Sequence, residues 1–181
     1  EVPIENLIPN KIFFFFSHTI KKKPFNRLLL KSILAKKIQL VDYELIRDVK
    51  HSRLIGFGRY AGIVGCYNAF LTYGLKSGRY SLKPAHTCHD RKEVEAELKK
   101  VTVPNDFRVV LTGFGRVGHG AAEIMRLLPI KEITATEFLT QTFNYPVFTQ
   151  LESGDYYANT LNEPFDKTHF YKHPEHYIST F

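Results

Sequence analysis

The first third of the chain alternates between short apolar runs and segments with apolar residues at helical spacing. The aromatic run at residues 12–16 is typical of a strand, and residues 38–43 and 53–57 are predicted to be the next two strands. Apolar residues recur at helical spacing through residues 24–37, and residues 58–76 predict a long, well-buried helix. This order of elements predicts a mostly parallel sheet with helices on its faces.

A turn-rich loop over residues 77–90 precedes a second series of elements. They are a charged helix, a strand, a helix and two further strands, predicted over residues 91–100, 109–111, 119–128, 131–134 and 146–151. From Glu152 onward, the content of asparagine, aspartate, histidine and proline predicts an irregular segment.

These patterns predict an α/β protein made of two Rossmann-like units, each with three α/β/α layers and a mostly parallel sheet. We assign residues 1–100 to the remainder of a substrate-binding, catalytic α/β domain with its linker helix. Residues 101–181 are predicted to be the first part of a nucleotide-binding Rossmann domain. Such a domain has about six strands when complete, so we expect the chain to be truncated at both ends.

The sequence GFGRVG at residues 113–118 lies between the predicted strand and helix of this second unit. Strand, GxGxxG and helix in this order are the dinucleotide-binding fingerprint. Gly113 permits the tight turn, Gly115 lets the backbone approach a pyrophosphate, and Gly118 lets the helix pack closely on the strand. The pattern favours a nucleotide site over a purely structural glycine turn. A second GFGR, at residues 56–59, is interpreted mainly as close strand–helix packing.

The chain of 181 residues has a net charge of +7, with a basic run at residues 21–23. An anionic cofactor and a carboxylate substrate explain this charge as well as nucleic acid does, and no aromatic and basic motif of an RNA-binding fold accompanies it. We therefore expect no nucleic-acid partner, and the apolar runs are too short to span a bilayer. Cys66 and Cys88 have no motif spacing, which favours a reducing compartment, and we expect a cytoplasmic location.

Histidine is the main candidate for chemistry outside the glycine turn. His18 follows the first strand at its carboxyl end, where open α/β sheets bind ligands, although spacing alone favours a histidine satisfied by backbone groups. The donors in residues 86–89 are too close together to encircle an ion, and Pro174 interrupts any helix that would align the histidines of residues 169–176. We expect no metal site.

With these residues in view, the chain resembles the alanine dehydrogenase / saccharopine dehydrogenase superfamily. Within it, the resemblance is to the NAD-dependent, lysine-forming saccharopine dehydrogenases and their bacterial relatives. Three blocks carry the resemblance, namely FFFFSHTIKKKPFNRLLL, LVDYELIRDVKHSRLIGFGRYAGIVG and VVLTGFGRVGHGA. The tail, PVFTQL followed by FDKTHFYKHPEHYISTF, is similar to the same bacterial group.

The resemblance implies two α/β domains with the active site in the cleft between them. It implies hydride transfer between NAD and an amine-bearing carbon, after which the imine is hydrolysed to an amino acid and a 2-oxo acid. It assigns acid–base chemistry to His18, which reverses the interpretation from spacing alone. It also implies that Lys21 binds substrate carboxylate and that Arg53 and Phe57 face the substrate. The implied pyrophosphate contacts are Gly113, Gly115, Arg116, Val117 and Gly118.

The chain departs from the family pattern at three places. The family's acid–base lysine, and with it a substrate-binding arginine, would fall before residue 1, and Ser52-Arg53 replaces a basic pair. The acidic residue that holds the ribose hydroxyls is expected near Thr134, which we take as the cofactor contact, and Glu137 follows slightly late. We therefore expect NAD as the cofactor without excluding NADP.

The leading hypothesis is an NAD(P)-dependent oxidoreductase that acts on the CH–NH group of an amino acid, of the lysine-forming saccharopine dehydrogenase type. The first alternative is an enzyme like alanine dehydrogenase or transhydrogenase, and the second is a nucleotide-binding module without catalysis. The expected partner is a small amino-acid substrate, and the sequence predicts no particular oligomeric state. Because the acid–base lysine is missing, we expect the 181-residue chain alone to be inactive.

Overall fold

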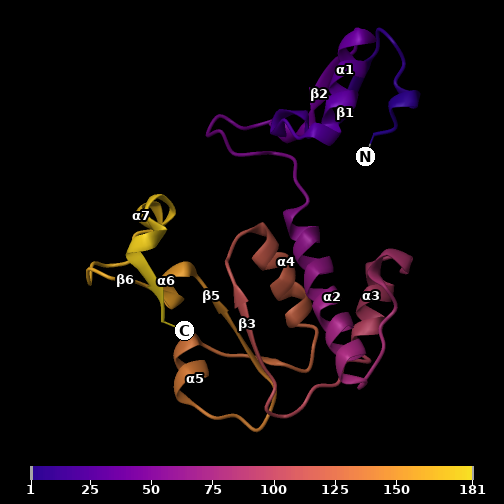
Figure 1. Cartoon of the computed structure of the whole chain (residues 1–181). Coiled ribbons are helices and arrows are strands. Elements are labelled where there is room, and N and C mark those ends of the chain that lie inside the picture. The colour runs from indigo at the N-terminus through magenta and orange to yellow at the C-terminus, as the bar shows by residue number, and fades with distance from the viewer. Residues whose placement is uncertain (1, 181) are drawn as a thin grey trace. The chain divides into compact units, whose positions relative to one another are not determined.

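The computed structural model describes residues 2–180 (Figure 1). The chain forms two compact units, the first ending at Phe57 and the second beginning at Gly58, and each is described by itself. Both units combine helices with small parallel sheets, so the predicted α/β class is confirmed at this level. The predicted division after residue 100 falls inside the second unit, and as a boundary between functional domains it stays a prediction.

The first unit is built on two parallel strands, β1 (Ile12–Phe15) and β2 (Gln39–Asp42), with α1 (Arg27–Ala35) between them in the chain. Ile12 pairs with Gln39 and Phe15 with Asp42, so both strands end at the same edge of the sheet. Helix α1 lies next to β1 and β2 (Figure 1). Its Leu29 and Ile33 form a buried cluster with Leu7, against which Phe13 and Phe15 of β1 pack. Short 3₁₀ turns complete the unit, at Ile4–Asn6, Thr19–Lys21, Pro24–Asn26 and Tyr43–Leu45.

The third strand predicted over residues 53–57 is wrong. Arg53 pairs with Arg47 as an isolated antiparallel bridge and is part of no named strand. The Asp48 carboxylate accepts hydrogen bonds from the backbone N–H groups of Lys50 and Ser52, and this closes a tight turn between the two arginines. The side-chain bonds of an aspartate favour a turn over an extended ladder, so the apolar residues that follow Arg53 do not join the sheet.

The second unit contains a three-stranded parallel sheet in the order β3-β5-β4. Its strands are β3 (Arg108–Thr112), β5 (Val147–Leu151) and the short β4 (Lys131–Glu132). The helices before and between the strands are α2 (Gly58–Ser77), α3 (Arg91–Leu98), α4 (Arg116–Met125) and α5 (Ala135–Thr140), with a 3₁₀ turn at Ala85–Thr87. The core joins Tyr67 and Phe70 of α2 to Leu98, Ile124 and Phe148.

Helices α2 and α4 lie side by side at backbone contact (Figure 1). A Cβ atom built on Gly62 would lie 1.9 Å from the carbonyl oxygen of Val117, and one on Gly120 would lie 1.9 Å from that of Arg59. The GFGR at residues 56–59 therefore leads into close helix–helix packing, and the predicted strand–helix packing at this copy is wrong. Arg59 also binds Glu123 of α4 through both carboxylate oxygens, at 2.6 and 2.8 Å.

The segment after Glu152, predicted to be irregular, contains regular structure. It forms α6 (Ser153–Tyr156), β6 (Tyr157–Asn159), α7 (Lys167–Lys172), a 3₁₀ turn (Pro174–His176) and β7 (Tyr177–Ser179). Strands β6 and β7 are antiparallel, and aromatic rings from Tyr157, Phe165, Phe170 and Tyr177 pack together beside them. These aromatic contacts provide the packing that orders the segment, which its content of asparagine, aspartate, histidine and proline did not indicate. Among residues 2–180, no helix has the length and apolar character needed to cross a membrane.

Candidate functional site

The carboxyl end of the two-stranded sheet carries the first candidate site. His18 follows β1 after Phe16 and Ser17, and Glu44 follows β2 after Tyr43. The side chains of His18 and Glu44 meet, with 2.8 Å between His18 Nδ1 and Glu44 Oε2. Because β1 and β2 are parallel and in register, residues just past both strands gather at one edge.

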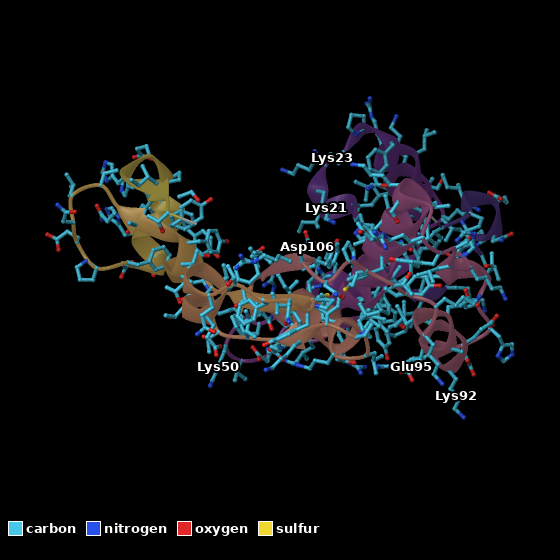
Figure 2. The ribbon with its side chains drawn as sticks, turned by 90° about the horizontal axis from the view of Figure 1, so that it is seen from below. Lys21, Lys23, Lys50, Lys92, Glu95 and Asp106 are labelled. Carbon is cyan, nitrogen blue, oxygen red and sulfur yellow. The ribbon has the colours of Figure 1, made fainter. Side chains whose placement is uncertain are left out.

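Two cations share the other oxygen of the same carboxylate. Lys21 Nζ lies 3.1 Å from Glu44 Oε1, and an Arg53 guanidinium nitrogen lies 3.5 Å from it. Figure 2 shows Lys21 and Lys23 at the turn that leads into α1. The Lys21 ammonium also lies 3.3 Å from His18 Nδ1. An ammonium can only donate, so it would need Nδ1 as an acceptor, whereas the Glu44 carboxylate can only accept and needs Nδ1 as a donor. Because the contact with Glu44 is the shorter one, we assign a proton to Nδ1.

Glu44 is the buried centre of this arrangement, with 11% of its side chain exposed, against 47% for His18. The hydrogen bond with His18 lowers the pKa of Glu44 below its ordinary value, and Lys21 adds to this effect, whereas burial opposes it. Glu44 is therefore a carboxylate at neutral pH and acts as the acceptor for the donors around it.

Buried hydrogen bonds to Asp42 fix the backbone on both sides of the site, at Ser17 next to His18 and at Glu44. Ser17 Oγ donates to Asp42 Oδ2 at 2.5 Å, and the other Asp42 oxygen accepts the backbone N–H of Glu44. His18 itself has a φ of +56°, in the left-handed region, and Asn26 Nδ2 donates to its carbonyl at 3.2 Å. A non-glycine residue in this region is uncommon and is often found at a functional site. The hydrogen bonds of Asp42 join the ends of both strands and thereby help to orient the imidazole.

Aromatic rings form one wall of the site. The Arg53 guanidinium lies 5.5 Å from the centroid of the Phe16 ring, within range of a cation–π contact. Phe57 packs on the same ring at 5.4 Å between centroids. Phe16 and His18 also line a cavity of about 370 Å³. The structure thus brings together all four residues predicted here, His18, Lys21, Arg53 and Phe57.

The second candidate site is the turn between β3 and α4. Gly113 has a φ of +90° and donates its backbone N–H to the Leu151 carbonyl at 2.7 Å. A Cβ atom on Gly118 would lie 2.0 Å from the Gly113 carbonyl oxygen, whereas one on Gly115 would meet nothing within 4 Å. Gly113 therefore provides the turn and Gly118 the close approach of helix to strand, while Gly115 borders open space.

This open space suits the pyrophosphate of a dinucleotide. A cavity of about 350 Å³ lies over the turn, lined by Gly113, Phe114, Gly115, Glu152, Ser153, Lys167 and Tyr171. Gly115 is the N-cap of α4, and Arg116 and Val117 form its first turn. Backbone N–H groups at a helix N-terminus bind phosphate oxygens. The residues present fit the group, since no side chain at Gly113 or Gly115 obstructs its approach.

Thr134 is not brought to this turn. It follows β4, and β5 separates that strand from β3. Thr134 is the N-cap of α5, where its hydroxyl and the Glu137 carboxylate form a reciprocal capping box. The assignment of Thr134 as a cofactor contact stays a prediction. Within residues 2–180, no three His, Cys, Asp or Glu side chains are grouped to hold a metal ion.

Sequence reasoning missed Glu44 and Glu152, the carboxylates that face the two sites. Both are acidic residues just past a strand, which is the available signal. At Glu44 the strand order is simple, because within residues 2–180 the sheet consists of β1 and β2 alone. In the sheet beside Glu152 the strands do not follow their order in the chain, since β5 lies between β3 and β4. The motif spacing therefore predicted Thr134, after β4, and not Glu152, after β5.

Comparison with known proteins gives matches over almost the whole chain. It is 31% identical to "Alpha-aminoadipic semialdehyde synthase, mitochondrial" of Rattus norvegicus, with 99% of this chain and 22% of the relative covered. The protein of the same name from Bos taurus is 30% identical with the same coverage, and the Arabidopsis thaliana synthase is 30% identical over 98% of this chain. The chain spans about a fifth of the length of these relatives. No family model matches.

Proposed function

Since this chain is homologous to a segment of the alpha-aminoadipic semialdehyde synthases, and the relation to saccharopine dehydrogenases is thereby confirmed, we propose a function in amine oxidation. The protein is an NAD(P)-dependent oxidoreductase that acts on the CH–NH group of an amino acid, of the lysine-forming saccharopine dehydrogenase type. The observation that carries the proposal is the His18–Glu44 contact at the strand edge, in a chain that also holds the glycine turn.

His18 is the acid–base residue of the proposal. With Nδ1–H bonded to Glu44, the neutral ring presents Nε2 as a proton acceptor. Glu44 orients the ring and stabilises the imidazolium that forms when Nε2 takes a proton from the substrate amine or from water. A carboxylate behind an imidazole performs the same task in other acid–base sites. The proposal therefore predicts proton transfer at Nε2.

Lys21 and Arg53 bind substrate carboxylate in this proposal. Both are partly exposed and lie near the same Glu44 oxygen, so the proposal places the substrate carboxylate beside these two cations. The cation–π contact with Phe16 and the hydrogen bond to the Ile55 carbonyl hold the Arg53 guanidinium in place. A substrate with several carboxylates needs more such cations than alanine does, and this supports the saccharopine type over the alternative of an alanine dehydrogenase-like enzyme.

The glycine turn holds the cofactor in this proposal. Gly113 and Gly115 leave room for the pyrophosphate, and the first turn of α4, with Arg116 and Val117, offers N–H groups to it. The chemistry that NAD would supply here is acceptance of a hydride from the amine-bearing carbon. Gly118 keeps the helix end at this distance from β3.

The test measures formation of NADH or NADPH by the full-length protein with saccharopine, alanine and lysine, each with NAD and with NADP. We expect turnover with saccharopine and a loss of roughly 10²–10⁴-fold in kcat for His18→Asn. His89→Asn, which changes a solvent-exposed histidine, is the matched control and keeps full activity. Turnover with alanine alone favours the alternative enzyme, and NAD binding without any turnover favours a non-catalytic nucleotide-binding module.

Arg53→Ala separates the two enzyme hypotheses. We expect it to raise KM for saccharopine by roughly tenfold or more, since a charge-assisted hydrogen bond contributes about 1.5–3 kcal/mol, and to affect a monocarboxylic amino acid less. The exposed Arg79 provides the control Arg79→Ala. Equal effects on both substrates contradict the saccharopine assignment.

Compartment and completeness are also part of the proposal. The rat and bovine relatives are named mitochondrial, so the expected cytoplasmic location is to be tested by fractionation of the native protein. The 181-residue chain alone is expected to bind NAD without turnover, and amine oxidation by it would contradict this expectation.

A further inference from the structure

We propose that the basic turn before α1 holds a second binding site, which takes the phosphate group of an organic ligand. Lys22, Lys23 and Arg27 line a cavity of about 370 Å³ at this turn. Neither His18 nor Lys21 is among the residues that line it. The inference therefore goes beyond the proposed amine oxidation and does not rest on it.

The positive charge of the chain is concentrated in the first unit. That unit has 11 Lys and Arg residues against 5 Asp and Glu residues, so it carries +6 of the net charge of +7. Its two buried carboxylates, Asp42 and Glu44, already bind partners inside the unit. An anion from outside is thus a natural counter-charge for the cations that remain.

The run of three lysines divides into a paired and an unpaired part. Lys21 lies 3.1 Å from Glu44, whereas Lys22, Lys23 and Arg27 form no ion pair with any residue between 2 and 180. Among these described residues, no Asp or Glu lines the cavity either. Like charges around one cavity repel one another, and a bound anion replaces this repulsion with attraction.

Hydrogen bonds hold the backbone of the turn in place. The N–H of Lys22 donates to the Thr19 carbonyl at 3.0 Å, and the N–H of Asn26 donates to the Lys23 carbonyl at 3.0 Å. Lys22 has a φ of +52°, in the left-handed region that lysine rarely adopts, and the ring of Pro24 restricts the next turn. Because this backbone is already ordered, a ligand that binds here loses less affinity to ordering of the protein.

The lining of the cavity favours a phosphate over a carboxylate. A phosphate monoester carries a charge of about −1.5 to −2 at pH 7 and three acceptor oxygens, whereas a carboxylate has a single charge and two oxygens. The planar guanidinium of Arg27 suits two phosphate oxygens at once, and Lys22 and Lys23 act as point charges.

The size and the apolar part of the cavity favour an organic phosphate over the bare ion. Leu30 and Pro24 line it together with the three cations. Its volume of about 370 Å³ falls within the range of small-molecule sites, roughly 300–1,000 Å³. The body of the ligand therefore lies against Leu30 and Pro24 while its phosphate faces the cations.

The experiment measures binding of phenyl phosphate to the full-length protein by isothermal titration calorimetry, with benzoate as the matched carboxylate. We expect phenyl phosphate to bind more tightly than benzoate, and its affinity to fall as salt is added. Lys22→Gln combined with Arg27→Gln should weaken phenyl phosphate binding by roughly tenfold or more, because neutral hydrogen bonds are about half as strong as charge-assisted ones.

The matched control combines Lys11→Gln with Lys50→Gln. It removes the same charge from exposed positions of the same unit that do not line the cavity, and it leaves the affinity for phenyl phosphate unchanged. Circular dichroism melting checks that each variant is folded. Equal affinities for phenyl phosphate and benzoate overturn the inference, as does wild-type affinity in the folded Lys22→Gln, Arg27→Gln variant.

Lysine acetylation followed by mass spectrometry locates the site in the unaltered protein. We expect phenyl phosphate to slow acetylation of Lys22 and Lys23 but not of Lys50, which lies away from the turn that carries Lys21 and Lys23 (Figure 2). Protection of Lys21 alone would place the phosphate in the amine-oxidation site and would overturn the inference.

A soluble organic phosphate and a lipid headgroup present the same chemistry, and vesicles distinguish them. The vesicles are phosphatidylcholine with and without phosphatidic acid. Phenyl phosphate binding without cosedimentation assigns the site to a soluble ligand. Cosedimentation that needs phosphatidic acid and is lost in the Lys22→Gln, Arg27→Gln variant assigns it to a headgroup. Binding of neither by a folded wild type overturns the inference and leaves the proposed function in place.

Discussion

Gly115 and Gly118 belong to one motif but carry different tasks, and substitution by alanine should separate them. At Gly118 the added Cβ would lie 2.0 Å from the Gly113 carbonyl oxygen, whereas ordinary contact begins at 3.4 Å. The overlap is thus 3.4 − 2.0 = 1.4 Å, and it is between helix and turn backbone. At Gly115 the added Cβ would meet nothing within 4 Å, and the φ of −77° suits alanine.

The magnitudes differ accordingly. Overpacking of a rigid contact costs about 3 kcal/mol, and the better helix propensity of alanine offsets about 1 kcal/mol. We therefore expect Gly118→Ala to destabilise the protein by about 2 kcal/mol, which corresponds to a fall in Tm of roughly 4–8 °C. In Gly115→Ala the loss of a favourable N-cap residue and the reduced entropy of the unfolded chain are each below about 1 kcal/mol and nearly cancel.

Gly115→Ala should change NAD binding although it leaves stability nearly unchanged. Its methyl group would occupy the space that the pyrophosphate enters, so we expect Gly115→Ala to weaken binding by at least roughly tenfold at unchanged Tm. The assays are thermal melting and calorimetric titration with NAD. Gly65→Ala, where a Cβ also meets nothing within 4 Å, is the helical control and should raise Tm slightly. Full NAD affinity in Gly115→Ala, or wild-type stability in Gly118→Ala, would refute the reasoning.

Two further predictions concern charge and burial in the second unit. Arg59 and then Arg91 hold the pKa of Glu123 to about 2, so the stabilisation by this carboxylate is fully present above its ordinary pKa of 4.5 and is lost as pH falls through about 2. Glu123→Gln should therefore lower the urea midpoint at pH 7, with a difference from wild type that closes toward pH 2, and a difference independent of pH would contradict this. Burial raises the pKa of the Cys66 thiol to about 11. At pH 8 we therefore expect Cys66, measured in a Cys88→Ser variant, to react with a disulfide reagent more slowly than Cys88, measured in a Cys66→Ser variant. The opposite order of rates would show that Cys66 is accessible as a thiolate.

Local sequence pattern predicted most elements but not their ends or their partners. Four elements form where the sequence predicted them: the strand at the aromatic run before Ser17, the helix after Pro24, and the strand and helix on either side of the glycine turn at residues 113–118. Their patterns reflect contacts between residues close in the chain. The failures have other causes. The strand expected at Arg53 is replaced by an aspartate-centred turn, and the segment after Glu152 is ordered by aromatic contacts among its own residues, such as Tyr157 with Phe170.

The carboxylates of the two sites show why function was harder to predict than fold. Glu44 and Glu152 each follow a strand that pairs in parallel with the strand before a motif residue, His18 in one unit and Gly113 in the other. A motif specifies its own strand, but the residue that faces it depends on which strand lies alongside, and sheet order is a long-range property. Counting about 20 residues from the glycines led to Thr134, because that distance assumes that the next strand in the chain is also the next in the sheet. Here β5 takes that place, so the residue that follows β5, and not the end of β4, lies beside the glycine turn.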